Sequence, residues 1–114
     1  MKLVCSISGR AEADLTHHYR WYWDHASVEV AERFLAAFDA TMQRLAKVPS
    51  LGRPRHFRAA ELHGVRSLLI GGGFDSHLVF YRVAGHTLNI ERVMHGARDL
   101  ENRLLEPPEG AAGA

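Results

Sequence analysis

The chain has 114 residues, which is enough for one domain built around a single hydrophobic core. Its composition, 46% hydrophobic and 24% charged, is ordinary for a globular protein, and it contains no apolar run of the roughly 20 residues that span a membrane. The single cysteine, Cys5, excludes an internal disulfide, and the N-terminus turns polar too soon for a signal peptide. We therefore expect a cytoplasmic protein.

The net charge of +1 is unevenly distributed along the chain. Residues 1–48 balance six basic against six acidic side chains, whereas residues 49–105 carry eight arginines, no lysine and five acidic side chains. Arginine pairs bidentately with carboxylate or phosphate and stacks on rings, so the second half could meet nucleic acid or an acidic protein surface. A solvated surface would have the same composition.

The first half of the chain predicts a strand followed by a helical hairpin. Residues 3–7 alternate in hydrophobicity as a short strand does. Ser8 is placed to cap a helix that we expect over residues 9–25. Ser27 is placed to cap a second helix that runs to about Lys47 and stops before Pro49. The short joint between the helices predicts an antiparallel pair.

Three strands and a short helix are predicted in the second half, after a turn-rich linker at residues 49–56. The strands, over residues 64–70, 76–83 and 87–94, are separated by short glycine-containing turns and most simply form an antiparallel meander. The partner of the first strand stays open, and a short helix is possible over residues 99–105.

The order β-α-α-β-β-β predicts an α+β fold. In this fold an antiparallel helical hairpin packs on one face of a curved, mainly antiparallel sheet. We expect a single domain over residues 1–105 and a disordered tail over residues 106–114, where proline, glycine and alanine predominate.

Six segments, in order, carry a pattern that spans nearly the whole chain. They are Ile7-Ser8 with Ala11 and Ala13-Asp14-Leu15; Ala31-Glu32-Arg33-Phe34; Leu45-Ala46 with Pro49-Ser50-Leu51-Gly52-Arg53-Pro54; Val65-Arg66-Ser67; Phe80-Tyr81-Arg82-Val83; and Ile90 to Leu100. In this order and at this spacing, the chain resembles the ParE branch of the RelE/ParE toxin superfamily, which implies a RelE/ParE-like fold.

The resemblance implies the toxin of a type II toxin–antitoxin system, neutralised by a ParD-like antitoxin in a hetero-oligomer. Toxins of this branch with an assigned target act on DNA gyrase, so we expect a gyrase inhibitor that works by binding, with no catalytic residue, cofactor or membrane contact. Relatives of the RelE branch share the fold and cut messenger RNA, which leaves a ribosome-dependent endoribonuclease as the alternative. A non-toxic relative that only binds its antitoxin is a further alternative.

The candidates for target binding lie on the arginine-bearing strands and at the turn that follows them. They are Arg66, Arg82, Arg92, His95, Arg98 and Asp99. A nuclease would need an acid, a base and cations for the phosphorane, which His95, Tyr81, Arg66, Arg82 and Arg92 could supply. No tyrosine follows Tyr81, so the C-terminal catalytic tyrosine of RelE-like enzymes has no counterpart here.

The same side chains could instead be structural. His95 could bond a backbone group, and Arg98 could pair with Asp99 to pin the turn. Arg92 could pair across the sheet with Glu61 or Asp75. Tyr81 could lie at the edge of the core with its hydroxyl group at the surface.

The candidates for antitoxin binding are aromatic residues of the first helix and arginines of the linker. They are Trp21, Tyr22, Trp23, Arg53 and Arg55. At 100° per helical residue the three rings cannot all face one way, so at least one tryptophan should be partly exposed. The histidines of this helix, His17, His18 and His25, lack the i, i+4 spacing of paired metal ligands, so we predict no metal site.

Overall fold

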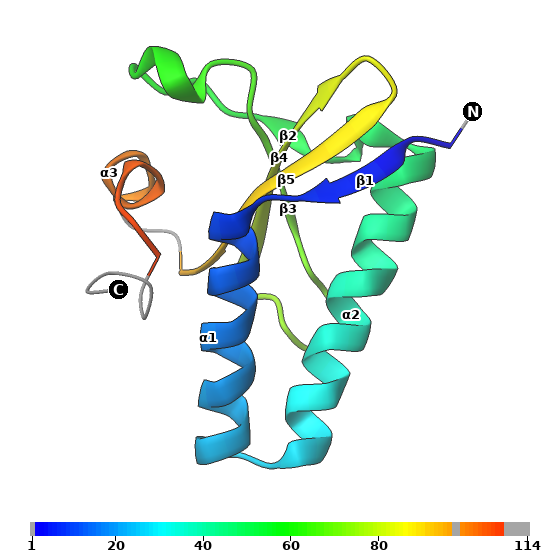
Figure 1. The fold of residues 1–114 in the computed structure, drawn as a ribbon, viewed down its shortest axis with the longest axis vertical. Coiled ribbons are helices and arrows are strands. Elements are labelled where there is room, and N and C mark those ends of the chain that lie inside the picture. Colours follow the sequence, from blue (N-terminus) through cyan, green and yellow to red (C-terminus); the bar gives the residue numbers. More distant parts are fainter. Residues whose placement is uncertain (1, 97–98, 109–114) are drawn as a thin grey trace.

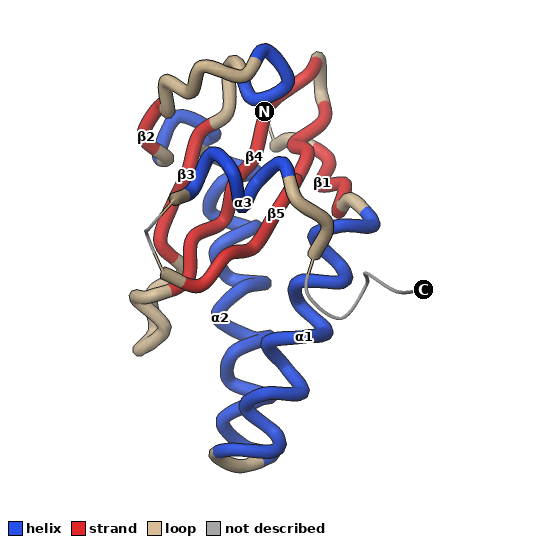
Figure 2. Tube along the Cα trace, turned by 90° about the vertical axis from the view of Figure 1, so that its left-hand side faces the viewer, coloured by secondary structure: helices blue, strands red, loops and turns tan. Residues whose placement is uncertain are grey.

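The computed structural model describes residues 2–96 and 99–108, and it places five strands in one sheet with helices on both faces. The main elements are, in chain order, β1 (Val4–Ile7), α1 (Gly9–His25), α2 (Val28–Lys47), β2 (Arg53–Pro54), β3 (Arg66–Leu69), β4 (His77–Ala84), β5 (Thr87–His95) and α3 (Leu100–Leu105). The α1–α2 hairpin covers one face of the sheet, and α3 lies on the other (Figure 1, Figure 2). The predicted α+β class and the order of its elements are confirmed.

Both helices of the hairpin begin at the predicted serine caps. The Ser8 hydroxyl accepts a hydrogen bond from the Ala11 N–H, and the Ser27 hydroxyl accepts one from the Val30 N–H. These bonds satisfy backbone donors that the first helical turn leaves without a partner. The two-residue joint between α1 and α2 returns the chain antiparallel to itself, as the sequence predicts.

The predicted meander is present, and the structure settles the pairing of the first strand. β3 pairs with β4 and β4 with β5, both antiparallel, while β1 pairs in parallel with β5 and forms one edge of the sheet. The opposite edge is the two-residue strand β2, which the sequence analysis did not predict. Its Arg53-Pro54 sequence looks like part of a turn, because proline cannot donate to a strand ladder.

Each face of the sheet has its own apolar cluster because successive residues of a strand point to opposite faces. The cluster under the hairpin includes Phe34, Phe38, Leu45, Val79, Tyr81, Leu88, Ile90 and Val93. The cluster under α3 contains Leu62, Val65, Leu78, Phe80, Met94, Leu100 and Leu104. β4 is therefore buried on both faces, and α3 is part of the folded core.

The chain stays packed beyond the end of α3. Residues 106–108, which the sequence analysis assigned to the tail, lie within the described part of the chain. The Glu106 carbonyl accepts a hydrogen bond from Arg92 Nη1 at 2.8 Å, and Pro108 is buried. The rest of the predicted tail, residues 109–114, lies outside the described residues.

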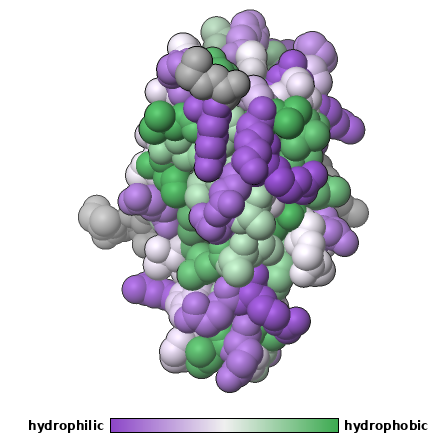
Figure 3. All heavy atoms as spheres, turned by 90° about the vertical axis from the view of Figure 1, so that its right-hand side faces the viewer, coloured by the Kyte–Doolittle hydropathy of each residue, from purple (hydrophilic) through white to green (hydrophobic). Residues whose placement is uncertain are grey.

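The surface is mixed in character. On the side that carries α2 in Figure 1, hydrophilic and hydrophobic side chains are interspersed (Figure 3). Within the described residues, no helix has the length and apolar character needed to cross a membrane.

Candidate functional site

Side chains of α1 complete the edge of β5 at the point where β1 ends. β1 pairs with β5 only as far as Ile90, and the Ser8 N–H then donates to the Ile90 carbonyl. Beyond this point two side chains of α1, Asp14 and His18, which lie one helical turn apart, take the place of a neighbouring strand along β5. The Asp14 carboxylate accepts from the Val93 N–H at 2.9 Å, and His18 Nε2 lies 2.9 Å from the Val93 carbonyl oxygen. Two polar side chains therefore satisfy backbone groups that an open sheet edge would leave unpaired.

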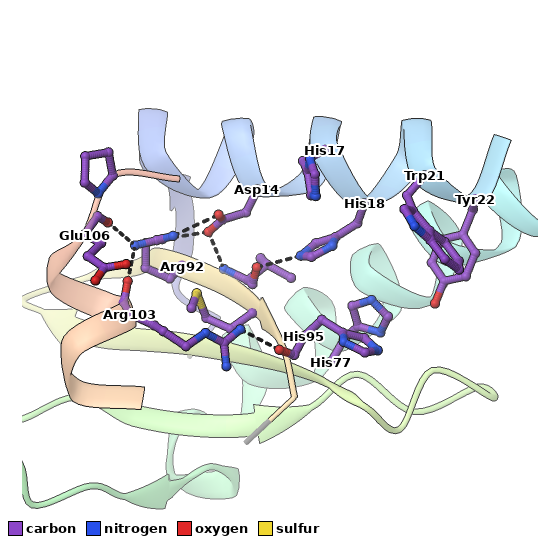
Figure 4. A pocket seen from close by; sticks show the side chains of 13 residues that line it. Asp14, His17, His18, Trp21, Tyr22, His77, Arg92, His95, Arg103 and Glu106 are labelled. Atoms are coloured by element: carbon purple, nitrogen blue, oxygen red, sulfur yellow. Dashed lines mark hydrogen bonds and ion pairs between the residues drawn. The ribbon is translucent and has the colours of Figure 1, made fainter. Parts of the chain in front are cut away.

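A buried ion pair joins α1 to β5, and its arginine also holds the end of α3. Arg92 Nε and Nη2 donate to the two carboxylate oxygens of Asp14 at 2.8 and 3.0 Å, and both residues are only 5% exposed. Arg92 Nη1 also donates to the carbonyl oxygens of Arg103 and Glu106 (Figure 4), and to that of Leu104. Since these carbonyls close the C-terminal end of α3, a single guanidinium group caps that helix and holds it to α1.

Three histidine rings form a row beside this ion pair. His77 lies between His18 and His95, with ring centroids 4.9 and 4.8 Å away. His77 is 2% exposed, and its Nδ1 atom has no hydrogen-bond partner among the described residues. Burial, together with the neighbouring imidazoles of His18 and His95, lowers the pKa of His77 to about 4.

At the His18 end of the row, a hydrogen bond fixes which ring nitrogen carries the proton. A carbonyl oxygen can only accept, so the contact with Val93 requires the proton of a neutral His18 ring to be on Nε2. Burial lowers the pKa of His18. The hydrogen bond to the Val93 carbonyl favours the protonated ring and partly offsets this effect. His18 and His77 are therefore neutral rings at physiological pH, and His95 is the exposed member of the row.

The row and the ion pair line one cavity between α1, the end of β5 and α3, with a volume of about 490 Å³ (Figure 4). Its lining residues are Asp14, His17, His18, Trp21, Tyr22, His77, Arg92, Val93, Met94, His95, Arg103, Glu106 and Pro107. This size is within the range of small-molecule and side-chain binding pockets. Within residues 2–96 and 99–108, no group of three or more His, Cys, Asp or Glu side chains is arranged to hold a metal ion.

Arg82 is fixed on the α3 side of the sheet. Its guanidinium group donates to both carboxylate oxygens of Glu91, at 2.5 and 2.7 Å, and to the backbone carbonyls of Glu61 and His63. The Arg82 side chain is 31% exposed. One edge of the Arg82 side chain therefore reaches the surface, while its guanidinium group is bonded to Glu91 and to the loop before β3.

Tyr81 and Arg66 hold the linker that follows α2. Tyr81 is fully buried, and its hydroxyl donates to the Pro49 carbonyl at 2.6 Å and accepts from the Gly52 N–H at 2.8 Å. Arg66 Nη1 donates to the Gly52 carbonyl at 2.8 Å. A Cβ atom at Gly52 would collide with the Tyr81 ring, so this close approach requires glycine. The idea that the Tyr81 hydroxyl lies at the surface is wrong.

The arginines of the meander do not share one face. Arg66 is paired with Tyr81, so these two residues point to the same side of the sheet. Arg82, the next residue after Tyr81, points to the other side. Arg92 pairs with Asp14 instead of Glu61 or Asp75, and its burial leaves it unable to reach a target unless α3 moves.

Three predicted site residues, His95, Arg98 and Asp99, belong to the end of β5 and the turn that follows it. The structural alternative expects the His95 ring to bond a backbone group. The bond observed is a different one: the His95 carbonyl accepts from Arg103 Nη2 at 2.5 Å, while the ring is exposed and lies beside the His77 ring. Asp99 is exposed, has a φ of 52°, and accepts from the Asn102 side chain at 2.9 Å. Arg98 and its predicted pairing with Asp99 lie outside the described residues.

The aromatic residues of α1 point in different directions. Trp21 and Trp23 are 50% and 49% exposed, and Trp21 stacks on His25 while Trp23 lies against Tyr19. Tyr22 turns inward and contacts Phe34 and His77. The prediction that at least one tryptophan is exposed is confirmed, and only Trp21 of the two lines the cavity.

The two linker arginines, Arg53 and Arg55, differ in their exposure and contacts. Arg53 is exposed at the short edge strand β2. Arg55 Nε donates to the Ser67 hydroxyl at 2.7 Å, and its guanidinium carbon lies 5.9 Å from the centre of the Phe80 ring.

Sequence reasoning missed the cavity residues Asp14, His18 and His77 as a group. A signal for two of them was present, because Asp14 and His18 are four residues apart and therefore lie on one face of α1. Polar residues on the inward stripe of a helix need partners, which points to a buried network. His77 carried no such signal, since its burial depends on the packing of α1 and α2 against β4.

The chain matches one family model over most of its length. The model, described as "ParE toxin of type II toxin-antitoxin system, parDE", matches residues 6–100. Toxin ParE1 of Mycobacterium tuberculosis is 32% identical over 100 residues, which cover 86% of this chain and 94% of that protein. Toxin ParE1 of Caulobacter vibrioides is 36% identical over 99 residues, with the same two coverages, 86% and 94%.

Solved structures share the fold. A structure titled as the chromosomal ParDE TA system from P. aeruginosa matches with a TM-score of 0.68 and 22% identity, over 84% of this chain and 98% of that one. A chain of the toxin–antitoxin complex RelBE2 from Mycobacterium tuberculosis matches with a TM-score of 0.58 and 19% identity, over 83% and 99%. At these identities the likeness concerns the fold alone.

Proposed function

Because the chain belongs to the ParE toxin family of type II toxin–antitoxin systems, we propose that it arrests growth by binding DNA gyrase. We further propose that a ParD-like antitoxin neutralises it in a hetero-oligomeric complex. The target and the antitoxin are more specific than family membership. Both proposals are argued from the positions and contacts of the charged and aromatic side chains.

The observation that carries a non-enzymatic mechanism is the engagement of the residues that a nuclease would need. Tyr81 is buried with both hydrogen-bonding capacities of its hydroxyl occupied. Arg92 is buried against Asp14, and Arg82 is held by Glu91. RNA cleavage requires an acid, a base and cations that converge on one phosphate, so this distribution favours binding over catalysis.

The surface beside α3 is the best candidate for contact with gyrase. His95 and Asp99 are exposed there, and part of the Arg82 side chain reaches solvent on the same side of the sheet. Arg66 points to the opposite side, so it does not belong to this surface. Arg92 supports the surface from below by fixing α3, and we do not assign it a direct contact.

The exposed aromatic residues of α1 and the arginine of β2 are the candidates for antitoxin contact. Trp21 and Trp23 are half exposed but face different ways, so one partner helix cannot cover both. An antitoxin segment that crosses α1 at Trp21 and continues along a sheet edge near Arg53 would combine an apolar anchor with an acid–arginine pair.

The alternative function is a ribosome-dependent endoribonuclease of RelE type. His95 is the feature that favours it, because its ring is exposed at the cavity and a histidine can serve as acid or base near neutral pH. The alternative requires other groups to converge on His95. The non-toxic relative is the third possibility and predicts no growth arrest at all.

The test is expression of His95→Ala in cells, with His86→Ala as the matched control. His86 is an exposed histidine in the β4–β5 turn, far along the strand from His95. If the toxin acts by binding, His95→Ala still arrests growth, because one contact among many is lost. Complete loss of arrest in a folded His95→Ala protein, together with messenger RNA cleavage by the wild type, would establish the nuclease instead.

A further inference from the structure

We propose that the basic loop, residues 53–63, binds the sugar–phosphate backbone of duplex DNA. The loop begins at β2 and stands out from the sheet on the side that carries α3 (Figure 1). It carries three arginines, Arg53, Arg55 and Arg58, and one acidic residue, Glu61. The choice of DNA rests on the proposed function, since gyrase acts on duplex DNA, whereas the case for phosphate binding comes from the loop itself.

Contacts with the sheet and with α3 hold the basic loop in one shape. The Glu101 carboxylate accepts hydrogen bonds from the N–H groups of Arg58 and Ala59 at 3.0 and 3.1 Å. Arg82 Nη1 donates to the His63 carbonyl at 2.8 Å. A loop that is already held in place can present its side chains to a ligand without a further loss of backbone freedom.

The arginines of the basic loop are available to an anion. Within residues 2–96 and 99–108, the exposed side chains of Arg53 and Arg58 make no hydrogen bond or ion pair. Arg55 Nε donates to the Ser67 hydroxyl, and Ser67 pairs with both Arg53 and Phe80, so the two arginines lie on the α3 side of the sheet. Burial and the nearby charge of Arg53 lower the pKa of Arg55. An anion bound beside both guanidinium groups would relieve their repulsion.

The surface of the basic loop suits the backbone of a duplex better than a protein or a single strand. Its two large apolar side chains, Phe57 and Leu62, pack into the cluster under α3, and its exposed residues include no large apolar side chain. Protein interfaces depend on apolar and aromatic anchors, whereas DNA interfaces are more polar and more positively charged. Single-strand binding uses exposed aromatic rings on which bases stack, and the loop exposes no Phe, Tyr or Trp. The arginine fork pairs bidentately with phosphate.

The number of arginines sets the expected strength of binding. Contact of Arg53, Arg55 and Arg58 with two or three phosphates gives a log–log slope of the binding constant against salt concentration of about −2 to −3. Binding is therefore weak and independent of sequence at physiological salt, and it is measurable at low salt. The antitoxin segment proposed at Arg53 would occupy the same guanidinium group, so antitoxin and DNA should exclude each other there.

The experiment measures binding of the full chain to a fluorescein-labelled DNA duplex of about 20 base pairs by fluorescence anisotropy, without gyrase, between roughly 50 and 200 mM NaCl. The double variant Arg53→Gln/Arg58→Gln removes two exposed side chains and should bind about tenfold more weakly or worse at the lowest salt, with a salt slope reduced by about 2. The matched control, Arg33→Gln/Arg44→Gln, removes the same charge from exposed positions of α2 and should bind like the wild type. No binding by the wild type, or an equal loss in both double variants, would overturn the proposal.

Two competitors separate DNA from the other anionic partners. A polyglutamate peptide should compete poorly at equal total charge, because its charges are spaced more widely than the phosphates of a duplex. Equal competition would assign the basic loop to an acidic protein, and tighter binding of a single-stranded RNA than of the duplex would assign it to RNA; either result would overturn the proposal. Gyrase inhibition is measured separately, so a toxin that inhibits gyrase but does not bind DNA would contradict this inference alone.

Discussion

The buried His77 ring should make this protein sensitive to acid. In the folded state its pKa is about 4, against 6.5 for an unperturbed histidine, because burial and the neighbouring imidazoles disfavour the charged ring. The unfolded state therefore takes up a proton below pH 6.5 that the folded state does not. The stability contributed by the neutral ring is complete above about pH 7 and is lost as the pH falls from 6.5 towards 4.

The size of the effect follows from the two pKa values. Linkage between 6.5 and about 4 gives a loss of about 2 kcal/mol in the free energy of unfolding between pH 7 and pH 5. His77→Phe removes the titrating group and keeps an aromatic side chain among the rings of Tyr22, Phe34 and Phe74. The variant should therefore lose less stability than the wild type over the same range.

Urea unfolding at pH 7 and pH 5, followed by circular dichroism, measures this difference. All other ionisable residues are common to both proteins, so the difference between them reports the loss of the His77 ring and of its coupling to His18 and His95. We expect the wild type to lose about 2 kcal/mol more than His77→Phe. The same loss in both proteins would refute the argument and would mean that the His77 ring is hydrated in the folded state.

Three other variants test the internal contacts. Arg92→Met should cost about 3–5 kcal/mol because it leaves the Asp14 carboxylate buried without its partner, and Asp14→Leu in the same chain should recover part of that loss, both read by urea unfolding. Tyr81→Phe should cost about 1–3 kcal/mol by orphaning two backbone groups of the linker, while growth arrest per folded molecule stays unchanged. Deletion of residues 101–114 should lower the melting temperature and antitoxin binding together, because it removes Leu104 from the core and the carbonyls that Arg92 caps. An unchanged melting temperature in that truncated chain would contradict the structural role of α3.

The local features of the fold were predictable because short-range chemistry fixes them. Ser8 and Ser27 precede good helical stripes, and each cap bond closes within three residues. The strands of the meander alternate in hydrophobicity and are separated by glycine turns, so their order in the sheet follows from the shortest connections.

What could not be predicted depends on contacts between distant residues. The parallel pairing of β1 with β5 joins residues more than 80 positions apart, and nothing in the sequence of a four-residue strand selects that partner. The Asp14–Arg92 pair spans 78 positions, so the sequence pattern offered Glu61 or Asp75 as partners for Arg92 and did not connect it with Asp14. Placing Arg66 and Arg82 on opposite sides required the register of β3 with β4, which a pattern alone does not supply.

We propose that this ParE-family chain stops growth by binding DNA gyrase without catalysis. The most direct measurement is a supercoiling and DNA-cleavage assay with purified gyrase and the full-length chain, with and without its antitoxin. We expect inhibition or trapped cleavage complexes that the antitoxin reverses. Normal supercoiling in the presence of excess folded toxin, with cleavage of ribosome-bound messenger RNA by the same preparation, would contradict it.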